Sequence, residues 1–69
     1  MSVEKSIDLS ATGSTIDEAV KQAIHRASLT IQGLTTFEVR SIQGTVEDGE
    51  VAYKVLVRVW FVVKERVHE

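Results

Sequence analysis

The sequence contains no cysteine and no proline, and it has only four glycines, one tryptophan, one tyrosine and two phenylalanines among its 69 residues. The absence of cysteine excludes disulfides, thiolate metal sites and cysteine nucleophiles together. A domain this short buries only about 60% of the surface that its unfolded chain exposes, and disulfides, metals or partner subunits normally supplement such a small core. With disulfides excluded, we expect several copies of the chain to associate.

The sequence also lacks an excess of charge and long apolar runs. Eight Lys and Arg stand against ten Asp and Glu, for a formal net charge of −2, and without a basic block a nucleic-acid or membrane-surface module is not expected. No apolar run approaches the ~18–20 residues of a transmembrane helix, and Met1 is not followed by a signal segment. We expect a soluble, cytoplasmic homo-oligomer with neither nucleic-acid nor membrane partners.

Hydrophobic periodicity predicts the order strand, helix, strand, strand. Residues 3–9 alternate like a half-buried strand, and residues 10–15 are expected to form a polar loop. Thr15 followed three residues later by Glu18 is a capping box, so the helix is expected over 16–31, with Gly33 ending it. Its apolar stripe repeats at steps of three and four residues: Val20, Ala23, Ile24, Ala27, Ile31 and Leu34.

Two more strands are expected, over residues 37–46 and 51–63. The apolar alternation of the first slips once, which predicts a β-bulge near Arg40-Ser41, and Asp48-Gly49 between the strands predicts a tight hairpin. The last strand is apolar on both faces and is therefore expected in the middle of the sheet. The fold class is α+β: a three-stranded antiparallel sheet, order 1-3-2, on one helix, in a single domain over 1–69. One helix covers only one sheet face, so the other face needs another subunit.

Residues for catalysis are scarce. No carboxylate is placed to orient His25 or His68 as a base, and the glycines lack the spacing of a phosphate loop. We therefore expect no enzyme activity. The acidic turn Glu47-Asp48-Gly49-Glu50 lacks the ligand pattern of a dedicated calcium loop, although several copies of one turn could meet around a symmetry axis.

The even-numbered face of the last strand carries the candidate binding residues. Trp60, the only tryptophan, is expected in a subunit interface, with stacking on a planar ligand as the alternative. Lys54 and Arg58 project from the same face and either hold an anion or pair with carboxylates such as Glu38 across an interface. The residues alone leave these alternatives open.

Short pieces of sequence follow one another in a characteristic order over nearly the whole chain: Asp17-Glu18-Ala19, Ala23-Ile24-His25-Arg26-Ala27-Ser28, Phe37-Glu38-Val39, Gly44, Val46-Glu47-Asp48-Gly49, Tyr53-Lys54-Val55, Val59 and Phe61. In their joint order and spacing these pieces resemble the dodecin family. The resemblance implies a three-stranded sheet folded around one helix, twelve copies in a hollow shell of cubic symmetry, and non-catalytic binding of riboflavin or FMN. In such proteins flavins are stored or sequestered as stacked pairs at two-fold axes.

The sequence departs from this family at positions of the flavin site. Thr36 stands where flavin-binding members usually carry a stacking tryptophan, and Lys54 stands where they usually carry a glutamine that hydrogen-bonds the flavin. Trp60 occupies a position where glycine is common. The resemblance thus implies one of two outcomes. Either a weak flavin site is rebuilt around residues such as Trp60, or the shell has lost flavin and holds an anion, a divalent cation or no ligand.

Overall fold

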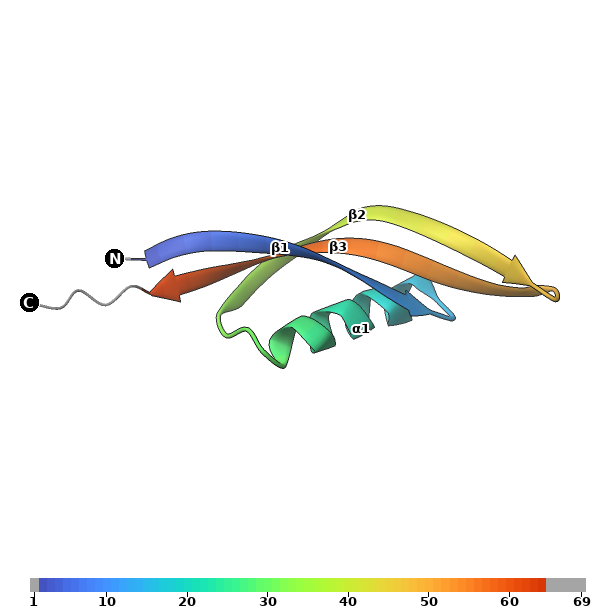
Figure 1. The fold of residues 1–69 in the computed structure, drawn as a ribbon, viewed down its shortest axis with the longest axis horizontal. Coiled ribbons are helices and arrows are strands. Elements are labelled where there is room, and N and C mark those ends of the chain that lie inside the picture. Colours follow the sequence, from blue (N-terminus) through green and yellow to red (C-terminus); the bar gives the residue numbers. More distant parts are fainter. Residues whose placement is uncertain (1, 65–69) are drawn as a thin grey trace, which may run out of the picture.

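The computed structural model describes residues 2–64, and Figure 1 shows the order strand, helix, strand, strand. The elements are β1 (Ser2–Gly13), α1 (Ile16–Ser28), β2 (Leu34–Glu47) and β3 (Glu50–Lys64). β3 lies between β1 and β2 and pairs antiparallel with both, which confirms the predicted order 1-3-2. Within residues 2–64, no helix is long and apolar enough to cross a membrane.

The β2–β3 hairpin forms as the sequence predicts. Asp48 and Gly49 both have positive φ, 52° and 79°, which is the backbone that a tight two-residue hairpin turn requires. The register along β2 shifts between Val39 and Ser41, so the predicted bulge near Arg40 is confirmed. A second shift lies between Leu34 and Thr36, at the start of a strand that begins three residues earlier than expected.

The predicted loop over residues 10–15 was wrong for residues 10–13, and the predicted helix end at residue 31 was wrong. Residues 10–13 continue β1 and pair with residues 53–56 of β3, because a long partner strand outweighs the weak strand preference of small polar residues. α1 ends at Ser28 instead of residue 31, with Leu29 as its C-cap. Gly33, at φ 82°, lies in the connection that follows, and its carbonyl accepts a hydrogen bond from the Val62 N–H.

The core is small and built from small side chains. α1 packs on β3 through Ala19, Ala23 and Ala27, and the three valines beneath them are buried: Val55, Val57 and Val59. The helix stripe was expected to run through Val20 and Ile24, but these residues are only half-buried beside the alanine line. Alanine has no side chain beyond Cβ, so this line lets the helix approach the sheet closely.

We expect Gly13→Ala to lower the melting temperature by several °C. A Cβ at Gly13 would lie 2.7 Å from the Ala19 backbone nitrogen, at the start of α1, so the helix would have to shift. Overpacking of this kind costs about 1–3 kcal/mol. Gly44→Ala is the matched control, because a Cβ there meets its first neighbour at an ordinary 3.7 Å. Equal melting temperatures for the two variants would contradict the close approach.

The helix covers only part of the sheet. At about 1.5 Å per residue α1 is ~20 Å long, whereas β3 spans ~50 Å at about 3.3 Å per residue. Figure 1 shows both ends of the sheet extending past the helix. Large apolar side chains are consequently exposed at many positions: Val3, Ile7, Ile16, Leu29, Phe37, Ile42, Val46 and Val51.

Candidate functional site

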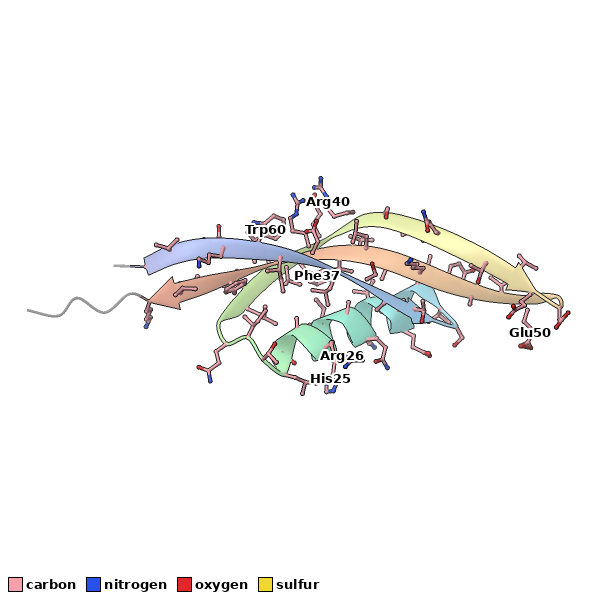
Figure 2. All side chains as sticks on the ribbon, viewed as in Figure 1. His25, Arg26, Phe37, Arg40, Glu50 and Trp60 are labelled. Atoms are coloured by element: carbon pink, nitrogen blue, oxygen red, sulfur yellow. The ribbon has the colours of Figure 1, made fainter. Side chains whose placement is uncertain are left out.

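The sheet face turned away from α1, here called the open face, carries all four candidate site residues. Alternation along β3 places the buried valines toward the helix and the intervening side chains on the open face. Figure 2 shows Trp60 and Arg40 projecting on the side of the sheet opposite α1. The cross-strand register then adds the paired positions of β1 and β2 to this face, including Ser6, Asp8, Thr36 and Glu38.

Trp60 lies in the middle of this face and is half-buried. Its cross-strand partners are Ser6 on β1 and Thr36 on β2. Side chains at directly opposite positions have Cβ atoms about 4.5–5.5 Å apart. The only tryptophan of the chain therefore stands beside the exposed Thr36, the position that the resemblance assigns to a stacking ring. An aromatic ring is therefore present on this face, but it comes from Trp60 on β3 instead of from position 36 on β2.

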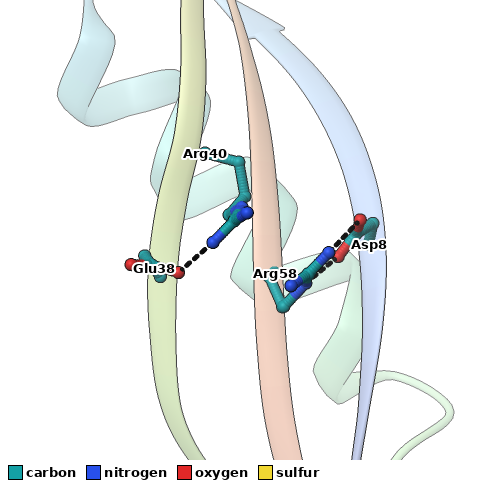
Figure 3. A network of polar contacts seen from close by, with 4 residues as sticks. All are labelled: Asp8, Glu38, Arg40 and Arg58. Carbon is teal, nitrogen blue, oxygen red and sulfur yellow. Dashed lines mark hydrogen bonds and ion pairs between the residues drawn. The ribbon is translucent and has the colours of Figure 1, made fainter.

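Next to Trp60 lies a row of four charged side chains (Figure 3). The Arg58 guanidinium binds the Asp8 carboxylate with two hydrogen bonds, of 2.7 Å from Nε and 3.2 Å from Nη2. Arg40 Nη1 binds Glu38 Oε1 at 2.7 Å. Arg58 is thus engaged by a carboxylate of its own chain, with Glu38 opposite it on the other side. The row is electrically balanced, so it neither attracts nor repels an anion strongly.

The hydrogen bonds from Arg58 hold the pKa of the Asp8 carboxyl below its ordinary value of 3.8, and they raise the pKa of the guanidinium. The folded-state pKa of Asp8 is therefore lower than the unfolded-state pKa. The stabilisation from this pair is present above pH 3.8 and is lost as the pH falls through the folded-state pKa.

We expect Asp8→Asn to lower the melting temperature at neutral pH and to match the wild type at strongly acidic pH. The asparagine cannot supply the charge that strengthens both hydrogen bonds. Melting curves between pH 2 and pH 7 would show the two proteins converging as the pH falls. Glu38→Gln serves as the control, because it removes a carboxylate from the same row of charged side chains and leaves the Asp8–Arg58 pair in place. A difference between Asp8→Asn and the wild type that stays constant with pH would contradict the linkage.

Lys54 lies farther along the open face. Six residues of strand, at about 3.3 Å each, separate it from Trp60 by ~20 Å. It lines a polar hollow of about 190 Å³ together with Ser10, Ser41, Gln43, Val55 and Leu56. The ion pairs found among residues 2–64 leave Lys54 without a carboxylate partner. Lys54 and Arg58 therefore do not act as one anion site, because only the lysine carries a free charge.

The remaining candidates for chemistry are dispersed. His25 is exposed on α1, and His68 lies outside the described residues. Over the described range 2–64, no three His, Asp or Glu side chains come together in a way that could hold a metal ion. The sequence did not predict that Asp8 belongs to this site. Period-two alternation shows which face of β1 Asp8 lies on, but only the register with β3 places it opposite Arg58.

The comparisons with known proteins agree with this architecture. A family model described as Dodecin matches residues 3–64. The crystal structure of a point mutant of the Thermus thermophilus dodecin is 33% identical with a TM-score of 0.88, over 94% of this chain and 100% of that one. The dodecin from Streptomyces coelicolor is 31% identical with a TM-score of 0.86, over 94% of this chain and 96% of its own.

A more distant match carries a different ligand in its description. It is the calcium-chelating immunodominant antigen, a calcium dodecin, from Mycobacterium tuberculosis, which is 22% identical with a TM-score of 0.73 over 97% of this chain and 96% of that chain. At this identity the likeness is one of fold. No curated protein sequence gives a significant match. The family match over residues 3–64, the shared strand order and the two dodecin structures lead to one conclusion: the chain belongs to the dodecin family.

Proposed function

We propose that this chain forms a homododecameric, non-catalytic shell that binds flavin, riboflavin or FMN, for storage or sequestration, with Trp60 as the stacking residue. The observation that carries the proposal is the position of Trp60, directly across β2–β3 from Thr36 on the open face. The indole takes over the stacking that the resemblance assigns to position 36. The proposal keeps the cytoplasmic location expected from the sequence.

The open face suits a planar, weakly polar ligand. Each aromatic contact to a stacked ring is worth roughly 1–3 kcal/mol by analogy with base stacking. Two copies related by a two-fold axis would bring two Trp60 rings, one from each, to the same ligand pair. The charged row beside the indole is paired internally, Arg58 with Asp8 and Arg40 with Glu38, so no free charge needs to be desolvated when a ligand arrives.

A second candidate ligand is a small anion at Lys54. The hollow around Lys54 offers an ammonium, two hydroxyls and a carboxamide without a carboxylate. Lysine has only donors, whereas the glutamine usual in flavin-binding members has a donor and an acceptor. In this alternative inorganic phosphate raises the melting temperature of the wild type and leaves that of Lys54→Gln unchanged.

The proposal is tested by titrating riboflavin with the purified protein and following the quenching of flavin fluorescence. We expect saturable quenching near one flavin per subunit, and a loss of at least tenfold in affinity for Trp60→Leu. Sedimentation of the same samples shows whether the variant keeps the wild-type assembly. Quenching that is absent in an intact wild-type shell would overturn the flavin proposal and favour the anion.

A further inference from the structure

A polar hollow of about 320 Å³, here called the edge hollow, lies between the end of β1 and the flank of α1. The strand lines it with Ser10, Ala11 and Thr12, and the helix lines it with Gln22, Ala23 and Arg26. Its apolar floor consists of Ala23, which is fully buried, and Ala11, which packs against the core. Because alanine has no side chain beyond Cβ, these two residues leave open the space that larger side chains would fill.

The strand side of the edge hollow is an unpaired edge of the sheet. Among residues 2–64, β1 pairs with β3 and with no other strand, so one edge of β1 is the edge of the sheet (Figure 1). In an antiparallel strand, one of every two successive residues turns its N–H and C=O away from the paired strand. The backbone hydrogen bonds that residues 2–64 form outside the helix and the strand ladders do not involve residues 10–12. At least one backbone N–H of this segment is therefore available to a ligand.

The helix side of the edge hollow supplies a positive charge. Gln22 and Arg26 are four residues apart, so they lie one turn apart on the same flank of α1, and Figure 2 shows Arg26 on this helix. The hydrogen bonds and ion pairs formed among residues 2–64 leave both side chains without a partner. A guanidinium carries five N–H donors in a planar fork, and a carboxamide carries two. The hollow thus combines one cation with N–H donors from both of its sides.

The acidic residues next to the edge hollow in the sequence are engaged elsewhere. Glu18, one turn before Gln22, accepts a hydrogen bond of 3.3 Å from the Ser14 hydroxyl at the start of α1. Asp8, two residues before Ser10, binds Arg58 on the open face. Neither carboxylate lines the hollow. An anion in the hollow would therefore meet Arg26 without competition from these two groups.

We propose that the edge hollow binds the oxyanion group of a small molecule, a carboxylate or a phosphate. The Arg26 guanidinium binds two oxygens of the group through its planar fork, and Gln22 and the edge N–H of β1 donate to the oxygens that remain. At about 30 Å³ for each water-sized group, the hollow has room for roughly ten such groups, so the body of the molecule fits over the alanine floor as well. The site is separate from Trp60, and it shares only Ser10 with the hollow around Lys54.

The test follows the melting temperature of the full chain in inorganic phosphate and in succinate, each compared with sodium chloride at equal ionic strength. A ligand that binds only the folded state raises its stability, so at least one of the two anions is expected to raise the melting temperature of the wild type until the site is saturated. Arg26→Gln is expected to abolish this rise. Lys21→Gln is the matched control, because it removes the same charge from α1 at a residue that pairs with Asp17 and lines the groove on the β2 side of the helix. Both altered side chains are exposed, so both variants are expected to fold, as far-UV circular dichroism would show.

The two anions distinguish the sources of the oxyanion. A response to phosphate alone identifies a phosphate ligand, and a response to succinate alone identifies a carboxylate ligand. Lys54→Gln is expected to respond as the wild type does, which separates the edge hollow from the anion candidate at Lys54. If Arg26→Gln also responds as the wild type does, the anion binds elsewhere and the proposal is overturned. A wild type that responds to neither anion would overturn it as well.

Discussion

Trp60→Arg is expected to break the assembly into smaller species. Trp60 is half-buried on a sheet face that no element among residues 2–64 covers, and tryptophan in such a place is typical of an interface centre. An arginine there would add a positive charge beside Arg58 and Arg40, whose carboxylates are already engaged. Facing copies would then bring like charges together in a contact that excludes water.

Sedimentation velocity on the wild type and on Trp60→Arg measures this directly. Trp60→Phe is the control, because it keeps an aromatic ring and adds no charge, and it should sediment as the wild type does. If Trp60→Arg keeps the wild-type profile, Trp60 does not lie in an interface. The open face would then be free in the assembly, and the two-fold arrangement in the proposed function would fail with it.

Thr36→Trp is expected to strengthen riboflavin binding by at least tenfold, which corresponds to about 1.4 kcal/mol. Thr36 is exposed and directly opposite Trp60, so a second indole would lie on the same face within reach of the same ligand. Thr45→Trp is the control, because Thr45 pairs with Ala52 near the β2–β3 turn and so places an indole on the open face far from Trp60.

The opposite result for Thr36→Trp would be informative. Unchanged affinity would mean that Trp60 fills the space in which a flavin would stack against position 36. In that case the site is closed to flavin, and the hollow around Lys54 becomes the stronger candidate. Equal gains for Thr36→Trp and Thr45→Trp would show that added aromatic surface binds riboflavin without a specific site.

The sequence predicted the features that depend on which side each residue faces. The bulge near Arg40 followed from one slip in alternation, and the place of β3 in the middle followed from its two apolar faces. The Asp48-Gly49 turn followed from backbone preference alone. Each of these signals comes from a short stretch of sequence, so it can be recognised without knowing which distant segments pair.

The features that the sequence did not predict depend on pairing between distant segments. Residues 10–13 extend β1 because β3 offers a partner strand, and Asp8 binds Arg58 because the register places the two residues opposite each other. Hydrophobicity ranked Val20 and Ile24 above Ala19 on the helix, but close packing buried the alanines and left the larger side chains at the flank. This packing leaves an open groove of about 460 Å³ beside α1, between Val20, Ile24 and Phe37.

The emission of Trp60 during a riboflavin titration shows most directly whether its indole stacks on the flavin. The chain has one tryptophan, so its fluorescence reports on the open face and on no other part of the molecule. If the indole stacks on the flavin, tryptophan emission and flavin emission fall together and saturate at the same ratio of flavin to subunit. If flavin emission saturates while Trp60 emission is unchanged, or if neither changes in an intact assembly, Trp60 is not the flavin-stacking residue.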